Sequence, residues 1–271
     1  MKPIFLRGVG LWTTGFPNPE AWCRDEAQHD LKTAEAALLE GPLRRRASAL
    51  TRISVDVFEQ STRAAGVDPS TIPTVWATAH GEHGTAIKLL KMMLRGEGKV
   101  SPTHFHNSVH NTSSAYASIA AGNGSASTTL TGGPELVSSA ILEAFCHLDA
   151  GTPEIVVVLS DEPLHPPFER ADMPEPLAIS FVFASEPGDA PFRLSNLRRE
   201  LLPPIKPHER LGSLYVSAGL PLLEHVVSRR PGTIPLEIEE HRRPGESANQ
   251  PAWCLDLEVL PAATSADRRA D

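Results

Sequence analysis

Short apolar runs alternate with segments of helical periodicity along the first 160 residues of the chain. The runs are bounded by glycine, proline or polar residues and predict strands at 4–11, 72–78, 127–131 and 155–159. Apolar residues at helical spacing predict helices at 48–65, 85–95, 135–149 and, after a loop, within 101–122. This alternation of strands and helices predicts an α/β fold whose sheet is covered by helices.

The later part of the chain has fewer predicted elements. The apolar segments 177–184 and 192–197 follow one another and predict a hairpin-like pair. Beyond them, one helix is expected at about 212–227, and two possible edge strands at 234–238 and 254–259. We therefore expect a mixed, about five-stranded sheet in a domain over 1–200, a short irregular extension over 201–260 packed on it, and a disordered tail over 261–271.

Two glycines, Gly8 and Gly10, fall within the first predicted strand and indicate a glycine turn at its end. They lack the third glycine and the immediate helix of a dinucleotide-binding loop, so a nucleotide cofactor is not indicated.

Charge and cysteine content narrow the class of protein. The 271 residues include 25 Lys and Arg against 33 Asp and Glu, a net charge of −8, which argues against a general binder of nucleic acid or membrane surfaces. Three widely spaced cysteines, Cys23, Cys146 and Cys254, support neither a disulfide framework nor a zinc knuckle. Apolar runs are too short for a signal peptide or a membrane span. We expect a cytoplasmic protein.

The order and spacing of several short motifs are more informative than any one of them. After the first strand, Val75-Trp76-Ala77-Thr78 is followed by Gly81, Ser101-Pro102-Thr103-His104-Phe105 leads toward a helix, and the strand 127–131 runs into a glycine turn. Taken together from about Ile4 to Leu197, they resemble the N-terminal half of a β-ketoacyl synthase, a condensing enzyme of the thiolase-like superfamily. The resemblance implies that this chain has the fold of one half of a thiolase-like enzyme.

The turn after strand 127–131 departs from that family. A condensing enzyme carries its nucleophilic cysteine there, at a helix N-terminus that lowers the thiol pKa. Here the turn contains Gly132, Gly133, Pro134 and Glu135, and Cys146 lies about three helical turns away. Glu135 is expected to cap the helix, or else to fill the space left by the nucleophile. The second half of the enzyme, with its two histidines, has no counterpart.

A half-length chain of this type, without the nucleophilic cysteine, is similar to the chain-length-factor-like subunits of aryl polyene and polyketide pathways. Those subunits pair with an active ketosynthase. This resemblance implies a heterodimer, an acyl carrier protein as second partner, and no cofactor. It implies a dimer seam along Ser127, Thr128, Thr129, Leu130 and Thr131, whose β-branched composition suits an edge strand. Candidates for the acyl tunnel or the interface are Phe105, His106, His110 and Asn111.

The compact basic run Arg44, Arg45 and Arg46 is a candidate docking site for an acidic carrier, with a solvated basic face as the alternative. Asn111 has an alternative too, as a cap or a loop hydrogen-bonding residue.

Histidines and serines offer two other kinds of chemistry, metal binding and hydrolysis. His106 and His110 are four residues apart, as on a zinc-binding helix, but the glutamate of that motif is missing, and His80 and His83 fall in a predicted turn. No metal site is therefore expected. Ser113 and Ser114 lack the glycine pattern of a hydrolase elbow. A small independent acyltransferase or hydrolase using these serines or histidines, and a structural homodimer, are the alternatives to a ketosynthase-like subunit without activity of its own.

Overall fold

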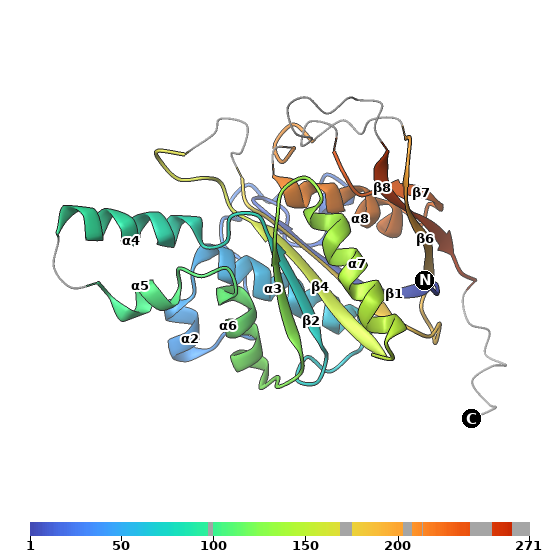
Figure 1. The fold of residues 1–271 in the computed structure, drawn as a ribbon, viewed down its shortest axis with the longest axis horizontal. Helices are drawn as coiled ribbons and strands as arrows, with labels where there is room; N and C mark the ends of the chain where they lie inside the picture. The colour runs from blue at the N-terminus through green and yellow to red at the C-terminus, as the bar shows by residue number, and fades with distance from the viewer. Residues whose placement is uncertain (97–99, 169–174, 203–207, 213, 239–250, 262–271) are drawn as a thin grey trace.

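The computed structural model describes residues 1–96, 100–168, 175–202, 208–212, 214–238 and 251–261. Its strands form one eight-stranded mixed sheet in the order β3-β2-β4-β5-β1-β6-β8-β7 (Figure 1). The strands are β1 Ile4–Thr13, β2 Thr74–Thr78, β3 Ser127–Thr131, β4 Glu154–Asp161, β5 Leu177–Ala184, β6 Phe192–Glu200, β7 Gly232–Pro235 and β8 Ala252–Val259. β2, β3 and β4 are parallel, so their carboxyl ends lie at one edge of the sheet.

Helices cover both faces of the sheet. They are α1 Pro19–Cys23, α2 Gly41–Arg46, α3 Ala49–Ala65, α4 His83–Arg95, α5 Pro102–His106, α6 Thr112–Ala121, α7 Leu136–Asp149 and α8 Leu220–Val227, with a 3₁₀ helix, η1, at Tyr215–Gly219. Residues of α7, η1 and α8 share one apolar core with one face of the central strands. Residues of α3 and α6 share the second core with the other face, and successive β4 residues such as Val157 and Val158 alternate between the two.

The predicted α/β class is confirmed, and the five neighbours β3, β2, β4, β5 and β1 are strands that the apolar pattern predicted. The expected number of about five strands is wrong for the whole sheet. β6, β8 and β7 continue it beyond β1, because β6 pairs with the first residues of β1 from Ile4 to Leu6. Part of the predicted extension therefore adds strands to the sheet.

Three local predictions after residue 170 are wrong. β5 and β6 do not form a hairpin, because β1 lies between them and pairs with β5 along its length. β8 is an interior strand, between β6 and β7. The single helix expected at 212–227 is divided into η1 and α8 within the described part, with Pro221 in the first turn of α8. The predicted tail lies almost entirely outside the described residues.

The glycine turn predicted at the end of the first strand is also wrong, because β1 continues through Gly8 and Gly10. The two glycines allow α3 to pack closely against the strand. A Cβ atom added at Gly8 would lie 2.3 Å from the carbonyl oxygen of Ser61, and one added at Gly10 would lie 2.5 Å from that of Val57. The motif is therefore explained by close packing of helix and strand.

Among the helices of the described residues, none has the length and apolar character to cross a bilayer.

Candidate functional site

The turn between β3 and α7 lies at the edge of the sheet where the parallel strands end. A Cβ atom added at Gly133 would lie 3.9 Å from Cζ of Tyr215, which belongs to η1. Glu135 occupies the N-cap position of α7, but its carboxylate makes no cap hydrogen bond and lies 3.7 Å from the Arg199 guanidinium. Glu135 therefore lies at the start of α7 as predicted, but it does not cap the helix through a side-chain hydrogen bond. Tyr215 and Arg199 come from the later part of the chain, and sequence reasoning assigned neither of them to this turn.

The three cysteines are placed away from this turn. Cys146 is exposed on α7, Cys23 ends α1, and Cys254 is buried in β8. Burial raises the pKa of the Cys23 thiol to about 11, with Glu224 and Glu20 adding to the effect, and burial also raises the pKa of Cys254. Both thiols therefore stay protonated near neutral pH, which makes them poor nucleophiles.

Two buried acids support the loop that follows β2. Asp161, 1% exposed at the end of β4, accepts hydrogen bonds from the hydroxyl of Thr78 at 2.8 Å and from the backbone N–H of Ala79 at 2.9 Å. Its second oxygen, Oδ2, is buried, and no residue in the described part of the chain hydrogen-bonds to it. Burial raises the pKa of Asp161 to about 7. Sequence reasoning missed this residue, although an acid directly after an all-apolar strand is a usable signal.

Glu82 is the second acid and is 3% exposed. It accepts hydrogen bonds from Ser48 at 2.6 Å and Thr51 at 2.7 Å, which connects the loop to the start of α3. Burial raises its pKa, opposed by these hydrogen bonds.

Three histidines lie together next to these acids. The ring centroids of His83 are 6.3 Å from His80 and 6.0 Å from His165, and Nδ1 of His83 accepts a hydrogen bond from the backbone N–H of His165. Burial lowers the pKa of His83, and the two neighbouring imidazoles lower it further. Within the described ranges, no group of three or more His, Cys, Asp or Glu side chains is arranged to hold a metal ion.

His106 and His110 do not share a helix. α5 ends at His106 and α6 begins at Thr112, so the helical face suggested by their spacing does not exist. The imidazole of His110 instead packs against Gly81, where an added Cβ would lie 3.0 Å from Cδ2 of the ring.

β3 is the terminal strand of the sheet, as its composition predicts. The backbone N–H of Thr74 donates to the carbonyl of Ala126, and the register pairs Thr74 with Ser127. In a parallel ladder this pattern directs the N–H groups of Thr128 and Leu130 toward β2 and that of Thr129 away from it. The outer edge of β3 therefore presents unpaired backbone groups. Its pairing with a second chain stays a prediction.

The helices α4, α5 and α6 expose large apolar side chains. We call these side chains together the apolar ridge, and its members lie on α4, on α6, and on α5 with the residues just after it: Leu90, Met93, Leu94, Phe105, Val109 and Ile119. Leu94 is 86% exposed and Phe105 is 66% exposed. α6 contacts the edge strand directly, since Oγ of Ser114 is 3.4 Å from Oγ1 of Thr129. Figure 1 shows α4 and α5 projecting from the body of the protein on the side of α6.

Sequence reasoning named Phe105 as an interface candidate but missed the part of the ridge on α4. The sequence did contain an indication of this part of the ridge, because the predicted helix has apolar residues on more than one side: Leu89-Leu90 and Met92-Met93-Leu94. The other candidates near Phe105 are exposed: His106, His110 and Asn111. Asn111 is the N-cap residue of α6, but its side chain makes no cap hydrogen bond, so the capping alternative is wrong.

The two candidate serines are buried and make structural contacts. Ser114 donates to the carbonyl of Asn111 at 2.9 Å, and Ser113 donates to the hydroxyl of Thr51 at 3.5 Å. The contacts found for these serines in the described residues include no histidine, so they do not form the serine–histidine arrangement of a hydrolase.

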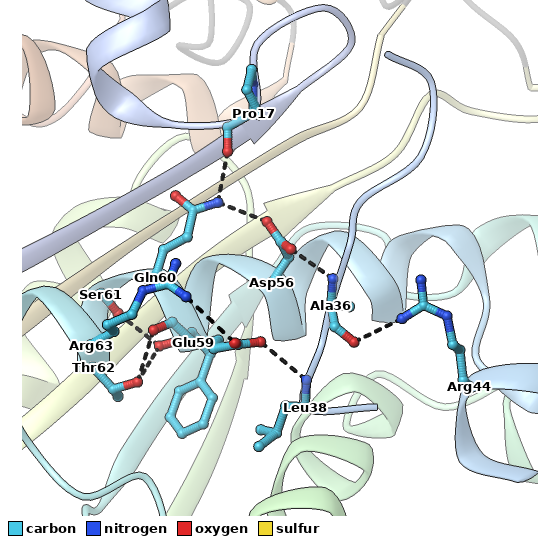
Figure 2. Close-up of polar contacts among 11 residues, drawn as sticks. Pro17, Ala36, Leu38, Arg44, Asp56, Glu59, Gln60, Ser61, Thr62 and Arg63 are labelled. Atoms are coloured by element: carbon cyan, nitrogen blue, oxygen red, sulfur yellow. Dashed lines mark hydrogen bonds and ion pairs between the residues drawn. The ribbon is translucent and has the colours of Figure 1, made fainter. Parts of the chain in front are cut away.

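One arginine of the basic run on α2 makes a structural contact. Figure 2 shows the Arg44 guanidinium donating to the carbonyl of Ala36, at 3.1 Å, on a segment that α3 also holds. Asp56 of α3 accepts the Ala36 N–H at 2.7 Å, and Glu59 accepts the Leu38 N–H at 3.1 Å. Arg45 and Arg46 are exposed. Only these two are therefore available as a fully solvent-facing basic patch.

Comparisons with known proteins agree with this architecture. The sequence model of the family described as β-ketoacyl synthase, N-terminal domain, matches residues 19–211. No curated protein matches the chain. A chain of the ketosynthase ApeO in complex with its chain length factor ApeC, from Xenorhabdus doucetiae, is similar with a TM-score of 0.65 and 18% identity, covering 94% of this chain and 100% of that chain.

Two further solved structures are similar. A chain of the AntDE:AntF complex, a type II polyketide synthase acyl carrier protein with its ketosynthase bound to the hexaketide, has a TM-score of 0.69 and 12% identity over 96% of this chain and 100% of that chain. A chain of the ishigamide ketosynthase/chain length factor has a TM-score of 0.59 and 13% identity over 74% and 67%, respectively. At these identities the likeness establishes a shared fold.

Proposed function

This chain belongs to the β-ketoacyl synthase N-terminal domain family, and from that premise we propose that it is a non-catalytic, chain-length-factor-like subunit that pairs with an active β-ketoacyl synthase. The partner supplies the thiol and the histidines of condensation. This chain supplies part of the wall along which the carrier-bound acyl chain extends, in polyketide, aryl polyene or fatty-acid-type biosynthesis.

The observation that carries the proposal is the open outer edge of β3, which runs directly into a turn without a nucleophile. An unpaired strand edge favours addition of a strand from another chain, because each new backbone hydrogen bond satisfies a donor or an acceptor. The apolar ridge lies on the same side, and exposed apolar surface of this kind marks protein interfaces. Residues 105 to 111 border both features and are proposed as interface residues.

The turn itself supports a role without condensation. Gly133 faces Tyr215, and Glu135 pairs with Arg199, so residues of the later strands and η1 occupy the surroundings of the turn. The turn residues Gly132, Gly133, Pro134 and Glu135 include no thiol or hydroxyl nucleophile.

Co-expression with a ketosynthase encoded beside this chain tests the proposal. We expect Thr129→Pro to reduce co-purification about tenfold, because it removes an outward N–H whose unsatisfied partner carbonyl costs about 1–3 kcal/mol. The bonds that β3 makes to β2 use the N–H groups of Thr128 and Leu130 and are kept.

Thr129→Ala is the matched control, because it removes the contact with Ser114 and keeps the N–H. We expect it to co-purify normally, and circular dichroism should show both variants folded. Equal recovery of ketosynthase with wild type and with Thr129→Pro would contradict the proposed dimer seam along β3. A chain that forms homodimers while ignoring the ketosynthase, or that itself becomes acylated by acyl carrier protein, would overturn the proposed function in favour of its alternatives.

A further inference from the structure

Helix α4 carries a second surface on a face that adjoins its part of the ridge. Lys88, Lys91 and Arg95 are spaced three and four residues apart and so share one helical face. Leu90 and Leu94, also four residues apart, belong to the ridge and lie on an adjoining face of the same helix. Lys88 and Lys91 are exposed. Helix α4, which projects from the body of the protein in Figure 1, therefore carries an exposed apolar face and an exposed basic face.

The basic face borders a hollow. A cavity of about 380 Å³ lies between α4 and the segment at His165 and Pro166, with Ile87 and Met92 in its lining. Lys91 Nζ donates to the carbonyl of Pro166 at 3.2 Å, which holds one ammonium at the rim. We call this hollow, with its lining cations Lys88, Lys91 and Arg95, the basic groove.

The nearby acid Glu162 is engaged at one end of the basic groove. It accepts the backbone N–H of Gly84 at 2.9 Å and lies 3.8 Å from Nε2 of His165. The Glu162 carboxylate therefore interacts with the start of α4 and with His165. Lys88 and Lys91 lie farther along the helix.

We propose that the basic groove docks the acidic surface of an acyl carrier protein, an inference that rests on the proposed function. The chain as a whole carries a net charge of −8, so three cations on one helical face are a local reversal of sign. Such a reversal attracts an acidic partner. The run Arg44 to Arg46 on α2 is the alternative docking site, and there Arg44 donates to the Ala36 carbonyl as Lys91 donates to that of Pro166.

The position of the groove suits this occupant. α4 faces the proposed ketosynthase with its apolar side, so a carrier held on its basic side lies next to the seam between the subunits. A carrier placed there delivers its acyl chain to the partner's nucleophile without contacting the turn of this chain.

A charge-matched pair of variants tests the inference. Lys88→Glu with Lys91→Glu, and Arg45→Glu with Arg46→Glu, each change the net charge by the same amount on exposed side chains. The probe is a purified, fluorescently labelled holo acyl carrier protein, titrated against the isolated chain and against its complex with ketosynthase at low and at moderate salt. We expect the α4 variant to weaken binding at least about tenfold at low salt and to flatten the salt dependence. The α2 variant should bind within about twofold of wild type.

Co-purification with ketosynthase separates the two proposals. An α4 variant that keeps its ketosynthase but loses carrier binding supports docking at the basic groove. Unchanged carrier binding by the α4 variant, or an equal loss in the α2 variant, overturns it while leaving the subunit pairing intact. If wild type fails to pair with ketosynthase, the proposed function fails, and the titration of the isolated chain still decides whether the basic groove binds the carrier.

Discussion

Asp161 ends β4 inside the protein, where desolvation opposes its ionisation. Three donors, from Thr78, Ala79 and His80, converge on one carboxylate oxygen, and the other oxygen has no partner among the described residues. The three hydrogen bonds favour the charged form, but burial opposes it more strongly, and the pKa is therefore raised. Because Asp161 holds the loop after β2 through these hydrogen bonds, its ionisation makes the stability of the fold depend on pH.

The sign of this linkage follows from the two pKa values. The pKa of Asp161 is raised from 3.8 to about 7 in the folded protein, so between these pH values the unfolded chain has lost a proton that the folded protein keeps. Stability from this group is therefore highest below about pH 4 and falls as pH rises to about 7, after which it is constant. Burial raises the pKa of Glu82 and Glu162 as well, which adds in the same direction.

We predict that Asp161→Asn reduces this pH dependence. The amide keeps an oxygen acceptor for Thr78 and Ala79 and cannot ionise. The loss of unfolding free energy between pH 5 and pH 8, measured by urea denaturation, should be at least ~1 kcal/mol smaller than in wild type. Asp149→Asn, on an exposed acid of α7, is the control and should follow the wild-type profile. If the unfolding free energies of Asp161→Asn and wild type change with pH in parallel, Asp161 does not cause this pH dependence.

At the scale of elements, the packing of α3 against β1 depends on glycine. We predict that Gly10→Ala lowers the melting temperature by more than about 5 °C, because the new methyl group would meet the carbonyl of Val57 at 2.5 Å and overpacking of this kind costs about 1–3 kcal/mol or more. Gly124→Ala is the control, since a Cβ there meets nothing within 4 Å. Differential scanning calorimetry makes the comparison. Equal melting temperatures would mean that α3 can move away from the strand at little cost.

Elements with local signals were predicted well. The helix expected at 48–65 is α3, where Ser48 accepts the N–H of Thr51 and Gly66 adopts the left-handed conformation that ends the helix. The turn before α7 and the terminal position of β3 were also expected from nearby residues. These features depend on interactions within a few residues, which a single sequence contains.

Pairing between distant elements could not be predicted in the same way. β5 and β6 are adjacent in the chain, yet each pairs with β1, which lies more than 160 residues earlier. The same limit applies to the site, because Tyr215 and Arg199 approach the turn at Gly133 and Glu135 from 64 or more residues later. Such contacts are set by how whole strands and helices pack, and hydrophobic periodicity does not report them.

At the scale of the whole molecule, exposed apolar surface is unevenly distributed. Six of the nine most exposed large apolar side chains in the described ranges belong to the apolar ridge, and α6, which carries Ile119, contacts the edge strand β3. A net charge of −8 keeps molecules apart at long range, but it is screened by salt over about 10 Å. An unpartnered chain should therefore self-associate as salt concentration rises, through the face that otherwise binds ketosynthase.

We predict that Leu90→Asp with Leu94→Asp suppresses this association, because two carboxylates replace apolar surface that a partner would bury and each leucine contributes about 1.5–3 kcal/mol when fully buried. Sedimentation velocity of the isolated chain at low and high salt measures the effect, and the variant should sediment as a monomer at both. Leu201→Asp is the control, because Leu201 is 63% exposed outside the ridge and its replacement should leave association unchanged. If the control suppresses association and the ridge variant does not, the contact lies elsewhere on the molecule, and the ridge loses its role as the shared face for partner binding and self-association.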